Sequence, residues 1–133
     1  MEIDKDLESN FKIYVDNDLI HIDFVSDFAD TEETNTRMME LVREELFNIF
    51  KADKNRKYKI IIEILYFSRG HISSGARKIW IELAKHEQIT KAAVVGQNVY
   101  LQVAANFIIN AARRNDTIHW FNDKKEALKW LEE

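Results

Sequence analysis

The chain has 133 residues, enough for one domain with a single hydrophobic core, and its 46% of hydrophobic residues exclude an intrinsically disordered protein. It contains no cysteine, which excludes disulfides, thiolate zinc sites and a cysteine nucleophile, so we expect a protein of the reducing cytosol. The net charge of −4 argues against a nucleic-acid partner, and the acidic N-terminus and short apolar runs predict neither export nor a membrane span.

The first half of the chain predicts a β-hairpin followed by a helix. The segments Asn10–Val15 and Asp18–Val25 are rich in β-branched and aromatic residues, and the polar residues between them form a turn signal. A capping-box-like pair, Asp30 and Glu33, then begins a helix whose apolar residues recur at helical spacing to about Lys51.

The second half of the chain alternates strands with helices. The run Ile60–Leu65 is apolar without alternation, which predicts a central strand covered on both faces. A helix beginning near Ser73 should follow, and Asp123 should cap a terminal helix. Between them we expect a strand at Lys91–Val95, a helix from Asn98 to about Arg114 and a strand at Thr117–Phe121.

This order of elements, ββαβαβαβα, predicts an α/β fold in a single domain, residues 1–133. Strands joined by single helices form right-handed parallel crossovers, and the N-terminal hairpin supplies an antiparallel edge. We therefore expect a mixed β-sheet with helices on both faces.

The sequence lacks the residue patterns of common metal and cofactor sites. Its four histidines form no pair at the i, i+4 spacing of helical zinc ligands. Residues 70–77 have the glycine spacing of a phosphate loop, but Ala76 stands where that loop needs a lysine. Glu63 lies within the most apolar strand and needs a partner there, so we interpret it as structural rather than as a general base. We expect no metal, no cofactor and no enzymatic activity.

Ser73 and Ser74 stand where the chain passes from a loop into a helix. A serine there can cap the helix by accepting a hydrogen bond from a free N–H group of the first turn. If phosphorylated, it would instead place negative charge at the positive end of the helix dipole. The residues alone favour capping, and the two serines are the candidate sites of phosphorylation.

The segment Ser73-Ser74-Gly75, which opens an amphipathic helix after an apolar strand, resembles the Asp-Ser-Ser-Gly segment of STAS domains, the anti-sigma-factor antagonist family. Ile72 stands at the position of the family's aspartate. The C-terminal half, from Lys91 to Leu131, resembles the SpoIIAA-like branch, whose domains close on a Phe, acid, Glu-Ala, Trp-Leu ending. The resemblance extends over essentially the whole chain and implies a SpoIIAA-like fold.

The resemblance also implies a non-enzymatic regulatory or protein-interaction module. In antagonists of this family a partner kinase phosphorylates the serine directly before the glycine, which is Ser74 here. The alternative is a small carrier of an apolar, lipid-like ligand, because STAS-like folds resemble lipid-transfer domains and the chain is rich in aromatic residues.

The third predicted helix has an apolar arc of about 240°, wider than one packing face requires. We expect Tyr100, Val103, Ala104, Phe107 and Ala111 to pack on the sheet. A second apolar stripe would be exposed in a monomer, so we expect it to form a homodimer contact. That stripe consists of Leu101, Ala105, Ile108, Ile109 and Ala112. Alternatively, the C-terminal helix with Trp130 covers it within one chain.

Overall fold

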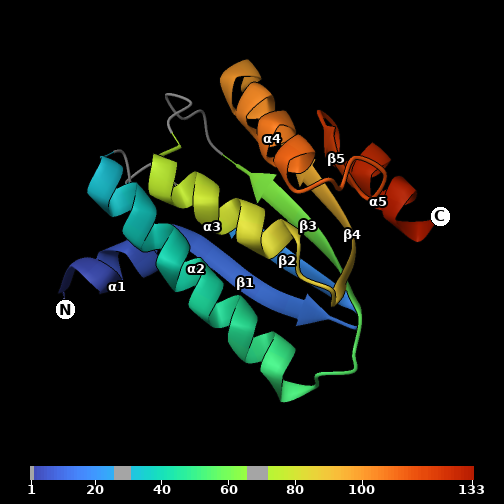
Figure 1. The fold of residues 1–133 in the computed structure, drawn as a ribbon, viewed down its shortest axis with the longest axis horizontal. Coiled ribbons are helices and arrows are strands. Elements are labelled where there is room, and N and C mark those ends of the chain that lie inside the picture. The colour runs from blue at the N-terminus through green and yellow to red at the C-terminus, as the bar shows by residue number, and fades with distance from the viewer. Residues whose placement is uncertain (1, 26–30, 66–71) are drawn as a thin grey trace.

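The computed structural model describes residues 2–25, 31–65 and 72–133, and it contains a five-stranded sheet in the order β1-β2-β3-β4-β5 (Figure 1). The strands are β1 (Phe11–Asp16), β2 (Leu19–Phe24), β3 (Tyr58–Ile64), β4 (Ile89–Val95) and β5 (Ile118–Phe121). The helices are α1 (Glu2–Glu8), α2 (Glu32–Ala52), α3 (Ser74–Ala84), α4 (Val99–Ala111) and α5 (Lys124–Glu132).

The predicted α/β fold is confirmed. The β1–β2 hairpin is antiparallel and turns at Asn17, whose φ of 57° lies in the left-handed region. β2, β3, β4 and β5 pair in parallel, as single-helix crossovers require. The prediction missed α1, because a short and mostly polar segment gives little periodic signal, although Leu7 is fully buried.

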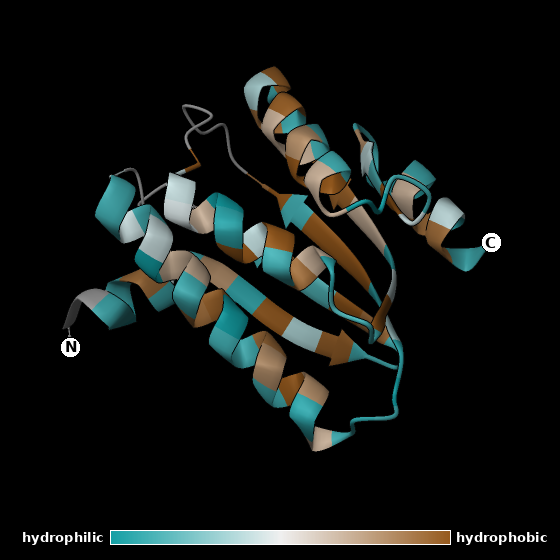
Figure 2. Ribbon diagram, in the orientation of Figure 1, coloured by the Kyte–Doolittle hydropathy of each residue, from teal (hydrophilic) through white to brown (hydrophobic). Residues whose placement is uncertain are grey.

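The helices form two unequal layers on the sheet. α2, α3 and α4 pack on one face against Ile22, Ile60 and Ile62, because a sheet that grows in one direction by right-handed crossovers places every crossover helix on the same side. α5 packs on the other face against Ile61 and Val95. In Figure 2 the central strands are brown, whereas the helices are banded brown and teal. The expected helices on both faces are present.

Side-chain caps fix where the helices begin. Thr31 caps α2 in a reciprocal capping box with Thr34, while the predicted start at Asp30 lies outside the described residues. Ser73, Asn98 and Asp123 cap α3, α4 and α5 as the sequence predicts. These caps place the start of each of these helices at the carboxyl end of a parallel strand, where functional side chains of α/β proteins gather.

Candidate functional site

Ser73 is a buried anchor of the turn that leads into α3. Its hydroxyl is fully buried and accepts a hydrogen bond from the Ala76 backbone N–H at 3.0 Å. It also shares a 2.6 Å hydrogen bond with the hydroxyl of Thr36 on α2, and its own backbone N–H donates to Asn35 Oδ1 at 2.9 Å. The predicted capping role is confirmed, and burial leaves no room for a phosphate on this hydroxyl.

Ser74, the first residue of α3, is exposed. The next residue, Gly75, packs against α2 so closely that a Cβ there would lie 2.6 Å from Thr36 Cγ2. The Ser-Ser-Gly segment therefore contains one buried anchor, one exposed hydroxyl and one close helix contact. Arg77 and Lys78 are exposed one turn further along α3, so a phosphate on Ser74 would meet both the helix dipole and two nearby cations.

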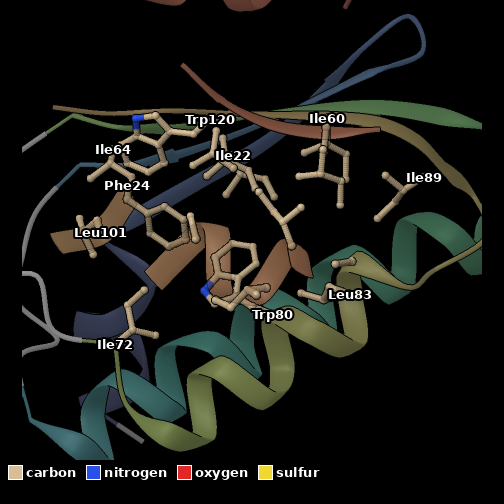
Figure 3. Close-up of a pocket in the computed structure, with 18 of the residues that line it drawn as sticks. Ile22, Phe24, Ile60, Ile64, Ile72, Trp80, Leu83, Ile89, Leu101 and Trp120 are labelled. Carbon is tan, nitrogen blue, oxygen red and sulfur yellow. The ribbon is translucent and has the colours of Figure 1, made fainter. Parts of the chain in front are cut away.

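An apolar cavity of about 100 Å³ lies between the sheet and helices α3 and α4 (Figure 3). Side chains from all three elements line it, including Phe24 and Trp80, whose rings meet edge to face with centroids 6.0 Å apart. Leu101 on α4 and Ile72, just before α3, also line the cavity. None of the described residues that line the cavity is charged, so these residues would hold an occupant by apolar contact.

The orientation predicted for α4 is wrong. The stripe predicted to be free is buried instead: Leu101, Ile108, Ile109 and Ala112 are 5–7% exposed, and Ala105 is half-buried and lines the cavity. The outward side chains are those of Val99, Tyr100, Val103 and Phe107, which are 59–72% exposed. Of the stripe predicted to face the sheet, Ala104 is buried and Ala111 is exposed. α5, with Trp130, lies on the other face of the sheet and covers neither stripe. An apolar arc this wide does not determine which part of it faces the sheet.

A polar cluster lies on the α5 face of the sheet, beside the end of β3. Glu63 is 7% exposed, and its carboxylate lies 2.7 Å from the Nζ of Lys124 at the start of α5. Asp23 is the neighbour of Glu63 across the parallel β2–β3 pair. Burial raises the pKa of Asp23 above its ordinary value, and the charge of Glu63 raises it further. Asp23 Oδ1 and His21 Nδ1 are both buried and have no hydrogen-bond partner among the described residues.

The expected partner of Glu63 is therefore Lys124, which the sequence could not identify because the two are separated by 60 intervening residues and two βα units. The hydrogen bond from Lys124 to Glu63 also raises the pKa of the lysine. Within the ranges that the structure describes, no three His, Asp or Glu side chains converge as metal ligands would. No helix in the same ranges is long and apolar enough to cross a membrane.

Comparison with known protein families finds a match over most of the chain. A family model described as SpoIIAA-like matches residues 20–132, from β2 to the end of α5. Comparisons with curated proteins and with solved structures give no match.

Proposed function

The chain belongs to the SpoIIAA-like family, and we propose that it is a non-enzymatic regulatory module that binds a partner protein and is controlled by phosphorylation of Ser74. The observation that carries the proposal is the exposed Ser74 hydroxyl at the N-terminus of α3, directly after the buried anchor Ser73. Membership of this family, which includes anti-sigma-factor antagonists, indicates the class of function. The exposure of Ser74 at this turn indicates the residue that would be modified.

The local geometry supports a switch that changes the surface without unfolding the domain. A phosphate carries about two negative charges at neutral pH, and at Ser74 it would lie beside free N–H groups of the first helical turn. The contacts of Ser73 with Thr36 and Asn35 do not involve the Ser74 hydroxyl, so they would survive the modification. A partner kinase would therefore act on an accessible side chain whose scaffold stays fixed.

Native mass spectrometry tests this proposal on protein purified from its own cells as wild type, Ser74→Ala and Ser74→Asp. We expect a protein partner on the wild type and on Ser74→Ala, and its loss or weakening on Ser74→Asp, with unchanged circular dichroism in all three. Equal partner occupancy in the three proteins, or no protein partner on any of them, would contradict the proposal.

A second candidate function, binding of a small apolar ligand, is favoured by the cavity beneath α3 and α4. Its volume of about 100 Å³ is below the usual range for ligand pockets, so a lipid-like ligand would enter only if α3 and α4 move apart. Titration with decanoic acid, followed by tryptophan fluorescence, tests this function. Ala105→Phe should block a fluorescence change that Ala111→Phe, on the exposed side of α4, leaves intact.

We also propose that the protein forms a homodimer through the outward side chains of α4, which are Val99, Tyr100, Val103 and Phe107. They replace the contact predicted from the sequence, whose residues face the sheet. α4 contains no charged residue from Val99 to Ala111, so two copies could pair antiparallel about a two-fold axis without repulsion. Sedimentation at micromolar concentration should give a dimer that Phe107→Asp converts to a folded monomer. Ile109→Asp should instead unfold the chain, because Ile109 is buried.

A further inference from the structure

The outer edge of β1 has backbone groups that no strand in the described part of the chain pairs. The Val25 N–H donates to the Asn10 carbonyl at 2.8 Å, so Asn10 and Val25 occupy a hydrogen-bonded pair position of the antiparallel hairpin, although the Asn10 N–H donates to the Leu7 carbonyl at 3.0 Å. In an antiparallel ladder such pairs alternate, and the residues between them direct their N–H and C=O groups to the other side. On β1 these outward-directed residues are Phe11, Ile13 and Val15.

The edge is regular, and it is most accessible toward its C-terminal end, since Phe11 is buried and Ile13 is half-buried. β1 pairs with β2 through all six of its residues without a bulge, and it contains no proline. Tyr14 is 47% exposed and Val15 is 39% exposed, and Lys12 and Asp16 are exposed as well. Figure 1 shows β1 as the outermost strand on the side of the molecule where α1 and α2 lie. Natural edge strands usually carry a device that blocks pairing, and here Lys12 is the clearest one.

The elements next to this edge are acidic. Residues 1–50 hold 14 acidic and 4 basic residues. Glu8 on α1 and Glu45 on α2 are exposed and have no ion-pair partner in the described part of the chain. Burial raises the pKa of Glu45, and the charge of nearby Glu8 raises it further. This side of the molecule therefore attracts positive charge.

We propose that a basic, extended segment of a partner protein adds to the sheet as a sixth strand beside β1. The outward N–H and C=O groups of Ile13 and Val15 would pair with the backbone of that segment, and Glu8 and Glu45 would attract its basic side chains. A second copy of this chain fits less well, because it would bring the same acidic helices against each other. The surface is separate from Ser74 and from the cavity, so its failure would leave the proposed function untouched.

The probe is a synthetic peptide of four Lys-Val repeats, used with amide hydrogen exchange on the full chain. At saturating peptide, the amides of Phe11, Ile13 and Val15 should exchange about tenfold more slowly. The amides of Lys12 and Tyr14, which already face β2, should not change. A peptide of four Glu-Val repeats is the charge control, and a Lys-Val peptide N-methylated at alternate residues is the control for backbone pairing; neither should slow exchange.

Val15→Pro supplies the control on the protein, because it removes one outward N–H group where an edge strand tolerates proline. It should abolish the protection of Ile13 while circular dichroism stays unchanged; if it unfolds the chain, the N-methylated peptide still decides. The proposal would be overturned by unchanged exchange at Ile13 or by equal protection from the Glu-Val peptide. It would also be overturned if the free chain formed a dimer that Val15→Pro dissociates.

Discussion

Ser73 and Ser74 are adjacent in the sequence but occupy opposite environments. Ser73 is fully buried between α2 and α3, whereas Ser74 is exposed at the first position of α3. One hydroxyl therefore contributes to folding, and the other lies at the surface. A sequence motif with two identical side chains acquires two environments because α2 packs over one of them.

Ser73→Ala should destabilise the domain by about 1–2 kcal/mol, because it removes the α3 cap and leaves the Thr36 hydroxyl without its partner. Urea unfolding measures the change. Ser74→Ala is the matched control and should shift the midpoint little, since its hydroxyl is exposed. Equal effects of the two substitutions on the unfolding midpoint would mean that the Ser73 hydroxyl contributes no more to stability than an exposed serine does.

Asp23 should make stability depend on pH in an unusual direction. Its pKa is raised above 3.8 in the folded state, so the folded state binds the proton more tightly than the unfolded state does. The stabilisation is complete below the unfolded pKa, near 3.8, and is lost as the pH rises through the folded pKa. His21, Lys12 and Lys124 oppose the upward shift that burial and Glu63 cause.

Asp23→Asn should therefore be more stable than the wild type at pH 7 and closely similar to it at pH 3, as measured by urea unfolding at both values. Asp16→Asn, which changes an exposed carboxylate on β1, is the control. A stability difference between Asp23→Asn and the wild type that stays constant across this range would show that ionisation of Asp23 does not affect folding.

At the scale of elements, α5 is fixed to β3 by the Glu63–Lys124 ion pair. Lys124→Met should leave a buried carboxylate without a cation and cost about 1–2 kcal/mol, less than for a fully buried pair because the Lys124 side chain is 49% exposed. Glu63→Gln combined with Lys124→Met should cost less than the sum of the two single changes. Strict additivity in this double-mutant cycle would show that the pair does not couple α5 to the sheet.

The strands and helix caps could be predicted from the sequence because they depend on local signals. Ser73, Asn98 and Asp123 identify helix starts through side chains that reach only two or three residues ahead. The orientation of α4 could not be predicted, because an uncharged helix with two apolar stripes gives no sign of which stripe meets the sheet. The cavity and the Glu63–Lys124 pair depend on segments far apart in the chain, which no local pattern connects.

At the scale of the whole molecule, the two faces of the sheet are packed differently. The α3–α4 side contains the apolar cavity, whereas the cluster under α5 includes Ala93 at 0% exposure. Ala92 and Ala93 are neighbours on β4, and their side chains point to opposite faces. This pair of alanines permits a direct comparison of the two packed layers.

Ala92→Val should stabilise the domain by about 1 kcal/mol, because the added methyl groups enter the cavity that Ala92 lines. Ala93→Val should destabilise it by about 1–3 kcal/mol, because the added volume meets close-packed side chains. Thermal unfolding of both variants provides the comparison. Destabilisation of similar size in both would mean that the cavity is already filled in solution.

Among the described residues, α5 is the single helix on its face of the sheet, which affects how that face is covered during synthesis. α5 follows every strand in the chain, so the sheet leaves the ribosome before the helix that covers Ile61 and Val95. Until α5 docks, those apolar side chains are exposed to water, and the Glu63 carboxylate is not yet paired with Lys124. A nascent chain that stops short of Lys124 therefore presents a half-covered sheet, the kind of surface that chaperones and proteases engage.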